Sequence, residues 1–205
     1  MVYSLPRLYK NEKGAYRFMQ QKKLRMLVEI ALFASIGVIF DMLTFTFMPQ
    51  GGGLSLTMIP ILLITIRWGF LAGVSTGMLI GFVDIATGAT VYHWAQVFLD
   101  HCLANAVIGF IAIFNKPIHA ALRDRNKGVL VISLTTGILI ASFCKYVVHV
   151  ISGAIFFYMY ANGQNVWLYS IIYNATPMIP TTIVVIICMV LLLSSTPKLV
   201  KSKFA

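Results

Sequence analysis

Charged residues are scarce in this sequence, and acidic residues are the scarcest of them. Asp, Glu, Lys and Arg make up 11% of the 205 residues, whereas 59% are hydrophobic. Soluble domains carry about 25% charged and about 45–50% apolar residues, so this composition excludes an ordinary soluble fold. The three cysteines all lie in hydrophobic runs and are too few for a disulfide framework.

Two motifs of catalysis are also missing. The sequence contains no G-x-x-x-x-G-K-[ST] phosphate-binding loop, which argues against ATP hydrolysis by this chain. It contains no H-E-x-x-H pair that would hold a catalytic metal. We therefore expect neither an enzyme nor a resident metal or cofactor.

What the sequence has instead is six near-continuous apolar segments. A transmembrane helix needs about 20 apolar residues at about 1.5 Å per residue. The segments cover residues 27–47, 54–66, 69–89, 95–114, 129–158 and 167–194. They predict an all-α membrane protein of six transmembrane helices, with a basic N-terminal arm at residues 1–25 and the membrane domain at residues 26–205.

The basic residues are distributed by topology. Fifteen of the sixteen Lys and Arg residues fall before the first span, in alternate loops and in the tail, whereas the intervening loops carry none. Because cytoplasmic loops carry the excess of positive charge, we predict that both termini are cytoplasmic. This asymmetry explains the net charge of +10 without a nucleic-acid partner.

Ionisable residues inside the predicted spans indicate a binding site, because such residues are costly in a membrane. Polar side chains from several helices share the outer half of the membrane: Asp41, Asp84, Asp100, His149, Tyr169 and Asn174. Lys145 lies deepest, and Asp84 or Asp100 is expected to supply its countercharge. The shared depth predicts a cavity open to the outside, and the alternative is a set of structural ion pairs. Glu29, four residues after Arg25, is interpreted as a boundary ion pair.

The fifth helix carries one polar face. Lys145, His149, Gly153 and Phe157 recur at every fourth position and share that face. A carboxylate beside an aromatic ring favours an aromatic cation as ligand. The glycine-rich segment 48–53 predicts a flexible outer loop rather than a tight turn, and this loop is expected to serve as a lid over the cavity.

Small residues recur at helical spacing on two other spans. Ala31 and Ser35 are four residues apart on the first helix, and Gly73, Gly77 and Gly81 follow the same spacing on the third. Small residues at this spacing let another helix approach closely.

The sequence resembles the thiamine-specific substrate-binding S components of energy-coupling factor (ECF) vitamin transporters over about residues 26–200. The segments that carry the resemblance are 48–52 (MPQGG), 58–61 (MIPI), 67–69 (RWG), 96–101 (QVFLDH), 145–146 (KY), 149–153 (HVISG), 166–170 (VWLYS) and 173–174 (YN). The fold that this resemblance implies has six membrane helices with both termini cytoplasmic, which agrees with the charge distribution.

The resemblance also implies which residues bind the substrate. They are Asp100, His101, Lys145, His149, Phe157, Tyr169 and Asn174, with Gln50 and Gly51 in the lid. Phe157 stands where the family has a stacking tryptophan, Asp100 where some members have Glu, and His101 where some have Tyr. Thiamine combines a thiazolium cation, which suits Asp100, with a flat aminopyrimidine, which suits Phe157 and Asn174.

The same resemblance implies partner proteins in the membrane and in the cytoplasm. Ala31 and Ser35 would dock on a transmembrane coupling subunit, and two ATPase subunits would supply energy from ATP, in a bacterial plasma membrane. The expected mechanism is binding from outside, closure of the lid at Gln50 and toppling of the whole S component within the bilayer to release thiamine inside.

Three other interpretations stay open at this point. The chain is alternatively an S component for another vitamin or a thiamine precursor. It is alternatively a stand-alone secondary transporter in which Asp84, Asp100 and His149 relay protons. A structural or assembly protein without a small ligand would leave the outer polar residues without a purpose.

Overall fold

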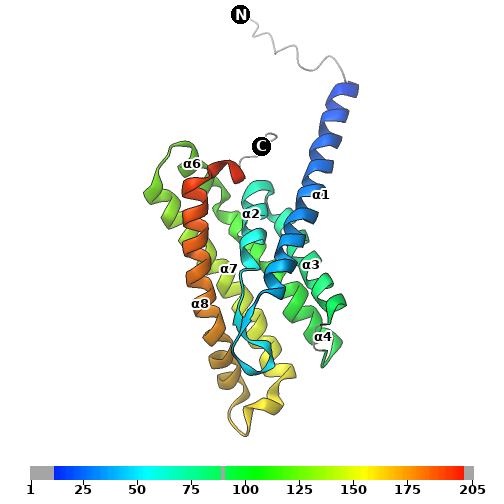
Figure 1. The fold of residues 1–205 in the computed structure, drawn as a ribbon, viewed down its shortest axis with the longest axis vertical. Helices are drawn as coiled ribbons and strands as arrows, with labels where there is room; N and C mark the ends of the chain where they lie inside the picture. The colour runs from blue at the N-terminus through cyan, green and yellow to red at the C-terminus, as the bar shows by residue number, and fades with distance from the viewer. Residues whose placement is uncertain (1–11, 89–90, 201–205) are drawn as a thin grey trace, which may run out of the picture.

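Six helical segments form the part of the chain that the structure describes, in agreement with the predicted fold. The computed structural model describes residues 12–88 and 91–200. In chain order the elements are α1 (Glu12–Met42), β1 (Phe45–Thr46), η2 (Pro49–Gly51), β2 (Gly53–Leu54), α2 (Met58–Trp68), α3 (Phe70–Thr87), α4 (Trp94–Val97), η3 (Phe98–Leu103), α5 (Ala104–Ala106), η4 (Val107–Phe114), α6 (Asn115–Arg123), α7 (Lys127–Phe156), η5 (Tyr158–Ala161), α8 (Val166–Ser195) and η6 (Pro197–Leu199). The elements α4 to α6 follow one another as a single helical stretch. Figure 1 shows an elongated bundle, in which the start of α1 and the end of α8 lie at the same end.

Four helical stretches in the described part of the chain are long and apolar enough to cross a membrane. They are Phe70–Thr87, Trp94–Arg123, Lys127–Phe156 and Val166–Ser195. The helices α1 and α2 complete the six. Helix α2 has eleven residues, about 16 Å at about 1.5 Å per residue, and residues 58–66 are all buried. It therefore lies inside the bundle, shorter than a full span.

The predicted boundary between the first two spans is wrong. Helix α1 ends at Met42 and α2 begins at Met58, and strands β1 and β2 pair between them as an antiparallel hairpin. Gly51 has a φ of +91°, a conformation that favours glycine. A Cβ atom on Gly53 would lie 2.5 Å from the carbonyl oxygen of Phe45. These glycines therefore permit a tight hairpin, where the sequence suggested a flexible loop.

The glycine stripe of α3 packs inside the molecule. A Cβ atom on Gly77 would lie 2.4 Å from the carbonyl oxygen of Asn105, and one on Gly81 would lie 2.4 Å from that of His101. The predicted close approach is confirmed, and the neighbour is the fourth helical stretch of the same chain. Residues 73–77 also have the G-x-S-x-G spacing of a hydrolase nucleophile elbow, but they lie inside α3 and not at a strand-to-helix turn.

The Glu29 carboxylate joins three elements at one end of the bundle. It accepts hydrogen bonds from Arg25 Nε at 2.9 Å, from the Trp68 indole N–H at 2.6 Å and from Arg67. Arg67 also donates to the carbonyl oxygen of Leu199 at 2.9 Å. The predicted pair of Arg25 and Glu29 is confirmed, and the same carboxylate ties α1 to α2 and, through Arg67, to η6.

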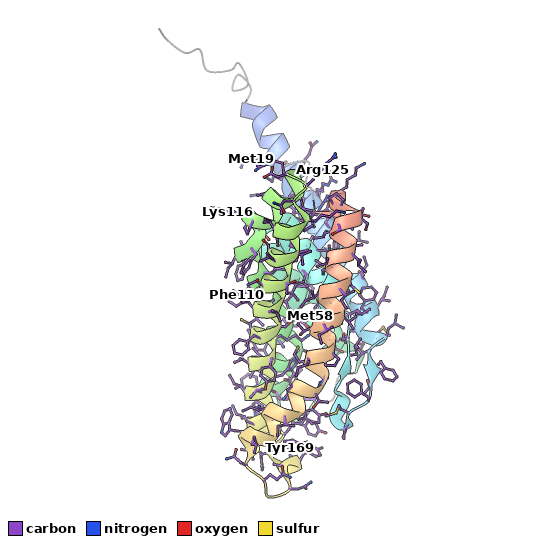
Figure 2. The ribbon with its side chains drawn as sticks, turned by 90° about the vertical axis from the view of Figure 1, so that its left-hand side faces the viewer. Met19, Met58, Phe110, Lys116, Arg125 and Tyr169 are labelled. Carbon is purple, nitrogen blue, oxygen red and sulfur yellow. The ribbon has the colours of Figure 1, made fainter. Side chains whose placement is uncertain are left out.

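The apolar core and the polar residues occupy different parts of the bundle. Figure 2 places Arg125 at one end, Tyr169 at the other and Met58 between them. The main apolar cluster continues from Met58 along α2 and includes fully buried side chains such as Ile61, Ile108, Leu134 and Met189. The polar side chains predicted from the sequence instead surround a cavity toward the Tyr169 end.

Candidate functional site

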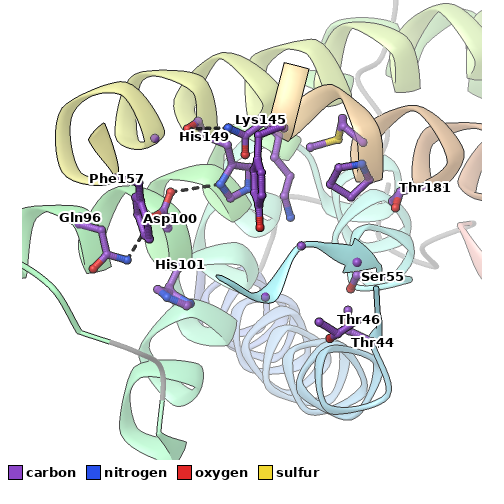
Figure 3. A pocket seen from close by; sticks show the side chains of 18 of the residues that line it. Thr44, Thr46, Ser55, Gln96, Asp100, His101, Lys145, His149, Phe157 and Thr181 are labelled. Atoms are coloured by element: carbon purple, nitrogen blue, oxygen red, sulfur yellow. Dashed lines mark hydrogen bonds and ion pairs between the residues drawn. The ribbon is translucent and has the colours of Figure 1, made fainter. Parts of the chain in front are cut away.

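A cavity of about 500 Å³ lies between the hairpin and the helical segments. This volume is typical of small-molecule sites, which measure about 300–1,000 Å³. All of the side chains predicted to bind substrate line the cavity: Asp100, His101, Lys145, His149, Phe157, Tyr169 and Asn174. Figure 3 shows five of them around one space: Asp100, His101, Lys145, His149 and Phe157.

Asp100 is held firmly at the wall of the cavity. One carboxylate oxygen lies 3.1 Å from His149 Nδ1, and the other accepts a hydrogen bond from Gln96 Nε2 at 3.1 Å (Figure 3). The side chain keeps 17% of its surface exposed. These partners orient the carboxylate, and its remaining lone pairs are available to a cationic ligand in the cavity.

The helix that carries Asp100 is locally wound as a π-helix. Residues Phe98–Leu103 form η3, between the short α-helices α4 and α5. Wide turns of this kind occur frequently at functional sites. Here Asp100 and its neighbour His101 both line the cavity, together with Gln96 and Asn105 on either side. The altered winding therefore presents a row of polar side chains to one space.

Lys145 makes its direct hydrogen bond to an amide, while the expected countercharges Asp84 and Asp100 act on it only through space. Lys145 Nζ donates to Asn105 Oδ1 at 2.8 Å, whereas Asp84 pairs with His101 Nδ1. The physical reason is that Asp84 and Asp100 each already have a histidine partner, and Asn105 lies one turn beyond His101. The alternative interpretation expected structural ion pairs, and two are present, His101 with Asp84 and His149 with Asp100. They border the cavity and do not fill it.

Helices α7 and α8 approach closely beside Asn174. A Cβ atom on Gly153 would lie 2.3 Å from Ser170 Oγ, which itself donates to the carbonyl oxygen of Val150 at 2.8 Å. Asn174 Nδ2 donates to the carbonyl oxygen of Ser170 at 2.9 Å. Because the side-chain nitrogen of Asn174 already donates to Ser170, its side-chain oxygen is the atom that can accept a hydrogen bond from a ligand.

Aromatic side chains border the same cavity. Tyr92 and Phe157 meet edge to face with ring centroids 5.0 Å apart, and the hydroxyls of Tyr92 and Tyr160 lie 3.0 Å apart. The rings of Tyr169 and Tyr173 are 5.7 Å apart. Phe157 therefore has a supported position, and its ring can stack on a flat ligand.

The hairpin covers part of the cavity. Gly51, Gly52 and Gly53 all line it, and the side chain of Gln50 lies outside the described part of the structure. A Cβ atom on Gly52 would lie 3.2 Å from the hydroxyl of Tyr173. Within the described residues, that buried hydroxyl has no hydrogen-bond partner, so it is a polar group that a ligand or a shifted hairpin can satisfy. A role for the hairpin as a moving lid stays a prediction.

The small-residue pair of α1 lies on the surface. Ala31 and Ser35 are both exposed, and the Ser35 hydroxyl donates to the carbonyl oxygen of Ala31 at 3.0 Å. Around them α1 also exposes large apolar residues, including Leu27, Val28 and Leu32. This face is open to lipid or to another membrane helix.

Sequence reasoning missed several lining residues. Gln96, Asn105 and Ser170 support the predicted ligand-binding side chains or line the cavity beside them. The spacing of Gln96 four residues before Asp100 offered a signal, because such residues are neighbours on a helix. The others depend on helix packing that the sequence does not specify.

Comparisons with known proteins agree along nearly the whole chain. The family model described as thiamine transporter protein matches residues 27–201. The thiamine transporter ThiT of Bacillus subtilis is 43% identical over 187 residues, which cover 89% of this chain and 97% of that protein. The thiamine transporter ThiT of Lacticaseibacillus paracasei is 28% identical over 194 residues, which cover 90% and 94%. A solved structure of ThiT from Listeria monocytogenes matches with a TM-score of 0.82 at 29% identity and covers 87% of this chain and 98% of that one.

Proposed function

The chain belongs to the thiamine transporter family, and on this premise we propose that it is the substrate-binding subunit of an ECF-type importer. In this role it captures thiamine from outside the cell and delivers it inward together with a coupling subunit and two ATPase subunits. It is a multi-pass membrane protein and not an enzyme, as its transporter relatives indicate. The positive-inside distribution supports a plasma-membrane location with both termini cytoplasmic.

The observation that carries the substrate assignment is a fixed carboxylate in an aromatic-bordered cavity. Asp100 would face the thiazolium cation, while Phe157 would stack on one of the rings. Asn174, Tyr169 and His149 would hydrogen-bond the edges of the aminopyrimidine. Each of these groups is a donor or acceptor of the type that an aminopyrimidine edge requires.

The remaining two predicted side chains would define the wall beside the cation. His101 is held by Asp84, and Lys145 is held by Asn105. We assign them to the binding site because both line the cavity next to Asp100. Their fixed partners keep the wall ordered before the ligand enters, which lowers the entropy lost on binding.

Closure would occur at the hairpin. Gln50 and Gly51 lie in its turn, and Gly51 to Gly53 border the cavity. Movement of this turn toward Tyr173 would shield the bound ligand from water. Toppling of the whole subunit within the bilayer would then carry the closed cavity inward.

Energy coupling would require contact with other subunits. The exposed pair of Ala31 and Ser35 offers a flat patch on α1 where a partner helix can approach closely. ATP would be hydrolysed by the partner ATPases, since this chain has no phosphate-binding loop.

Uptake of labelled thiamine into proteoliposomes tests the proposal. We expect uptake only when the coupling and ATPase subunits are present and ATP is enclosed with the ATPases. Uptake by this chain alone that follows a pH gradient would instead identify a proton-coupled secondary transporter. Uptake of riboflavin or hydroxymethylpyrimidine in preference to thiamine would reassign the substrate within the same architecture.

A further inference from the structure

A second cavity lies at the end of the bundle opposite the substrate site. It measures about 320 Å³ and lies between α1 and the turn that joins α2 to α3. We call it the interfacial groove, and the side chains that line it are Met19, Lys22, Lys23, Met26, Arg67 and Trp68. Figure 2 places Met19 at the same end as Lys116 and Arg125, far from Tyr169.

The groove combines an apolar floor with positive charge. Met19, Met26 and Trp68 supply the apolar surface, and methionine adapts readily to flexible ligands. Lys22 is half-buried and Lys23 is exposed. Among the described residues that line the groove, none is acidic. The lining therefore complements a ligand with both a negative group and a hydrocarbon part.

The network around Glu29 makes the groove a fixed structure. Arg67 is bound to Glu29 and to the carbonyl oxygen of Leu199, and the Trp68 indole donates to Glu29 at 2.6 Å. Glu29 also pairs with Arg25, so this single carboxylate serves two arginines. Lys22 and Lys23 line the groove as well and add their positive charges to that of Arg67.

The position of the groove along α1 indicates its depth in the membrane. The residues of α1 that follow Met26 expose apolar side chains to the surroundings, among them Leu27, Val28 and Leu32. Lysine and tryptophan are typical of the level where the hydrocarbon region meets the headgroups. The groove therefore lies where a phospholipid presents its phosphate and the first part of its acyl chains.

We propose that the interfacial groove binds an anionic phospholipid, with the lipid phosphate at Lys22 and Lys23 and an acyl chain against Met19, Met26 and Trp68. Basic pockets between membrane helices bind anionic headgroups in this manner. A lipid bound there would pack α1 against the α2–α3 turn. The site is separate from the substrate cavity and requires no substrate.

The test is native mass spectrometry of the delipidated full chain with added phosphatidylglycerol or phosphatidylcholine. We expect retention of phosphatidylglycerol in preference to phosphatidylcholine. The double variant Lys22→Gln/Lys23→Gln should weaken phosphatidylglycerol binding about thirtyfold, about fivefold for each lysine near the membrane surface. The matched control Arg125→Gln/Lys127→Gln removes two exposed charges from the same end of the bundle and should leave binding unchanged.

Several results would overturn the proposal. They are equal retention of the two lipids, equal losses in both double variants, and displacement of the lipid by millimolar inorganic phosphate. If the Lys22→Gln/Lys23→Gln variant no longer copurifies with the coupling subunit but still retains the lipid, the groove is a protein-docking face instead. A thiamine titration of each variant verifies folding, because neither pair of side chains lines the substrate cavity.

Discussion

Replacement of Asp100 by asparagine tests the electrostatic basis of substrate binding. The substitution keeps the size of the side chain and removes the negative charge that faces the cavity. Two unit charges 4 Å apart interact by about 4 kcal/mol at an effective dielectric constant of about 20. Hydrogen bonds to a charged group contribute about 1.5–3 kcal/mol. Because the asparagine oxygen still accepts hydrogen bonds and a neutral side chain is easier to desolvate, we expect a net loss of about 3 kcal/mol, or about 150-fold in affinity.

Isothermal titration calorimetry of the purified protein with thiamine measures this loss. The control is Asp124→Asn, since the Asp124 side chain is 59% exposed and contacts Arg123 outside the cavity. It should bind thiamine like the unmodified chain. A loss below about fivefold in Asp100→Asn, with cooperative unfolding retained, would refute the assignment of Asp100 as the countercharge of the ligand.

Three further substitutions examine packing and coupling. Gly81→Ala should lower the free energy of unfolding by about 1–3 kcal/mol and also weaken thiamine binding. The reason is that the new Cβ atom meets the backbone of His101, in the segment that carries Asp100. Thermal unfolding measures the first effect, and calorimetry measures the second. Glu29→Gln should lower the free energy of unfolding by about 2–3 kcal/mol, since it leaves Arg67 without its carboxylate partner; chemical unfolding followed by circular dichroism checks it. Ala31→Phe should abolish thiamine uptake by the reconstituted complex and leave thiamine binding unchanged, because it fills the small-residue face of α1.

Two of these substitutions, Gly81→Ala and Ala31→Phe, have a matched control. Gly128→Ala should be nearly neutral, because its Cβ meets only a side-chain atom at 3.5 Å. Leu32→Phe enlarges an exposed side chain beside the small face and should retain uptake. If Gly81→Ala and Gly128→Ala have the same free energy of unfolding, then α3 does not pack closely on the π-helical segment. Equal uptake by Ala31→Phe and Leu32→Phe would remove the coupling role of the small-residue face.

The sequence predicted the membrane fold and the group of side chains that line the cavity, because both have local signals. Apolar runs of spanning length determine where helices lie, and a four-residue spacing places Lys145, His149, Gly153 and Phe157 on one face. Polar residues at a common depth identified the end of the bundle that holds a cavity. Polar side chains gather at one depth because a membrane makes isolated polar side chains costly.

The sequence alone does not predict which polar side chains pair with one another. The sequence predicts a carboxylate countercharge for Lys145 but not its direct hydrogen bond to Asn105, nor the pairing of His101 with Asp84. Such pairing depends on how neighbouring helices pack. The glycines at residues 51–53 were ambiguous for a similar reason, since glycine permits both a flexible loop and a tight hairpin.

Calorimetric titration of the purified, detergent-solubilised chain with thiamine measures whether the cavity binds thiamine selectively. We predict saturable binding of one thiamine per chain, with little competition from riboflavin or hydroxymethylpyrimidine. A flat thiamine titration of protein that unfolds cooperatively would contradict the claim, as would tighter binding of either competitor.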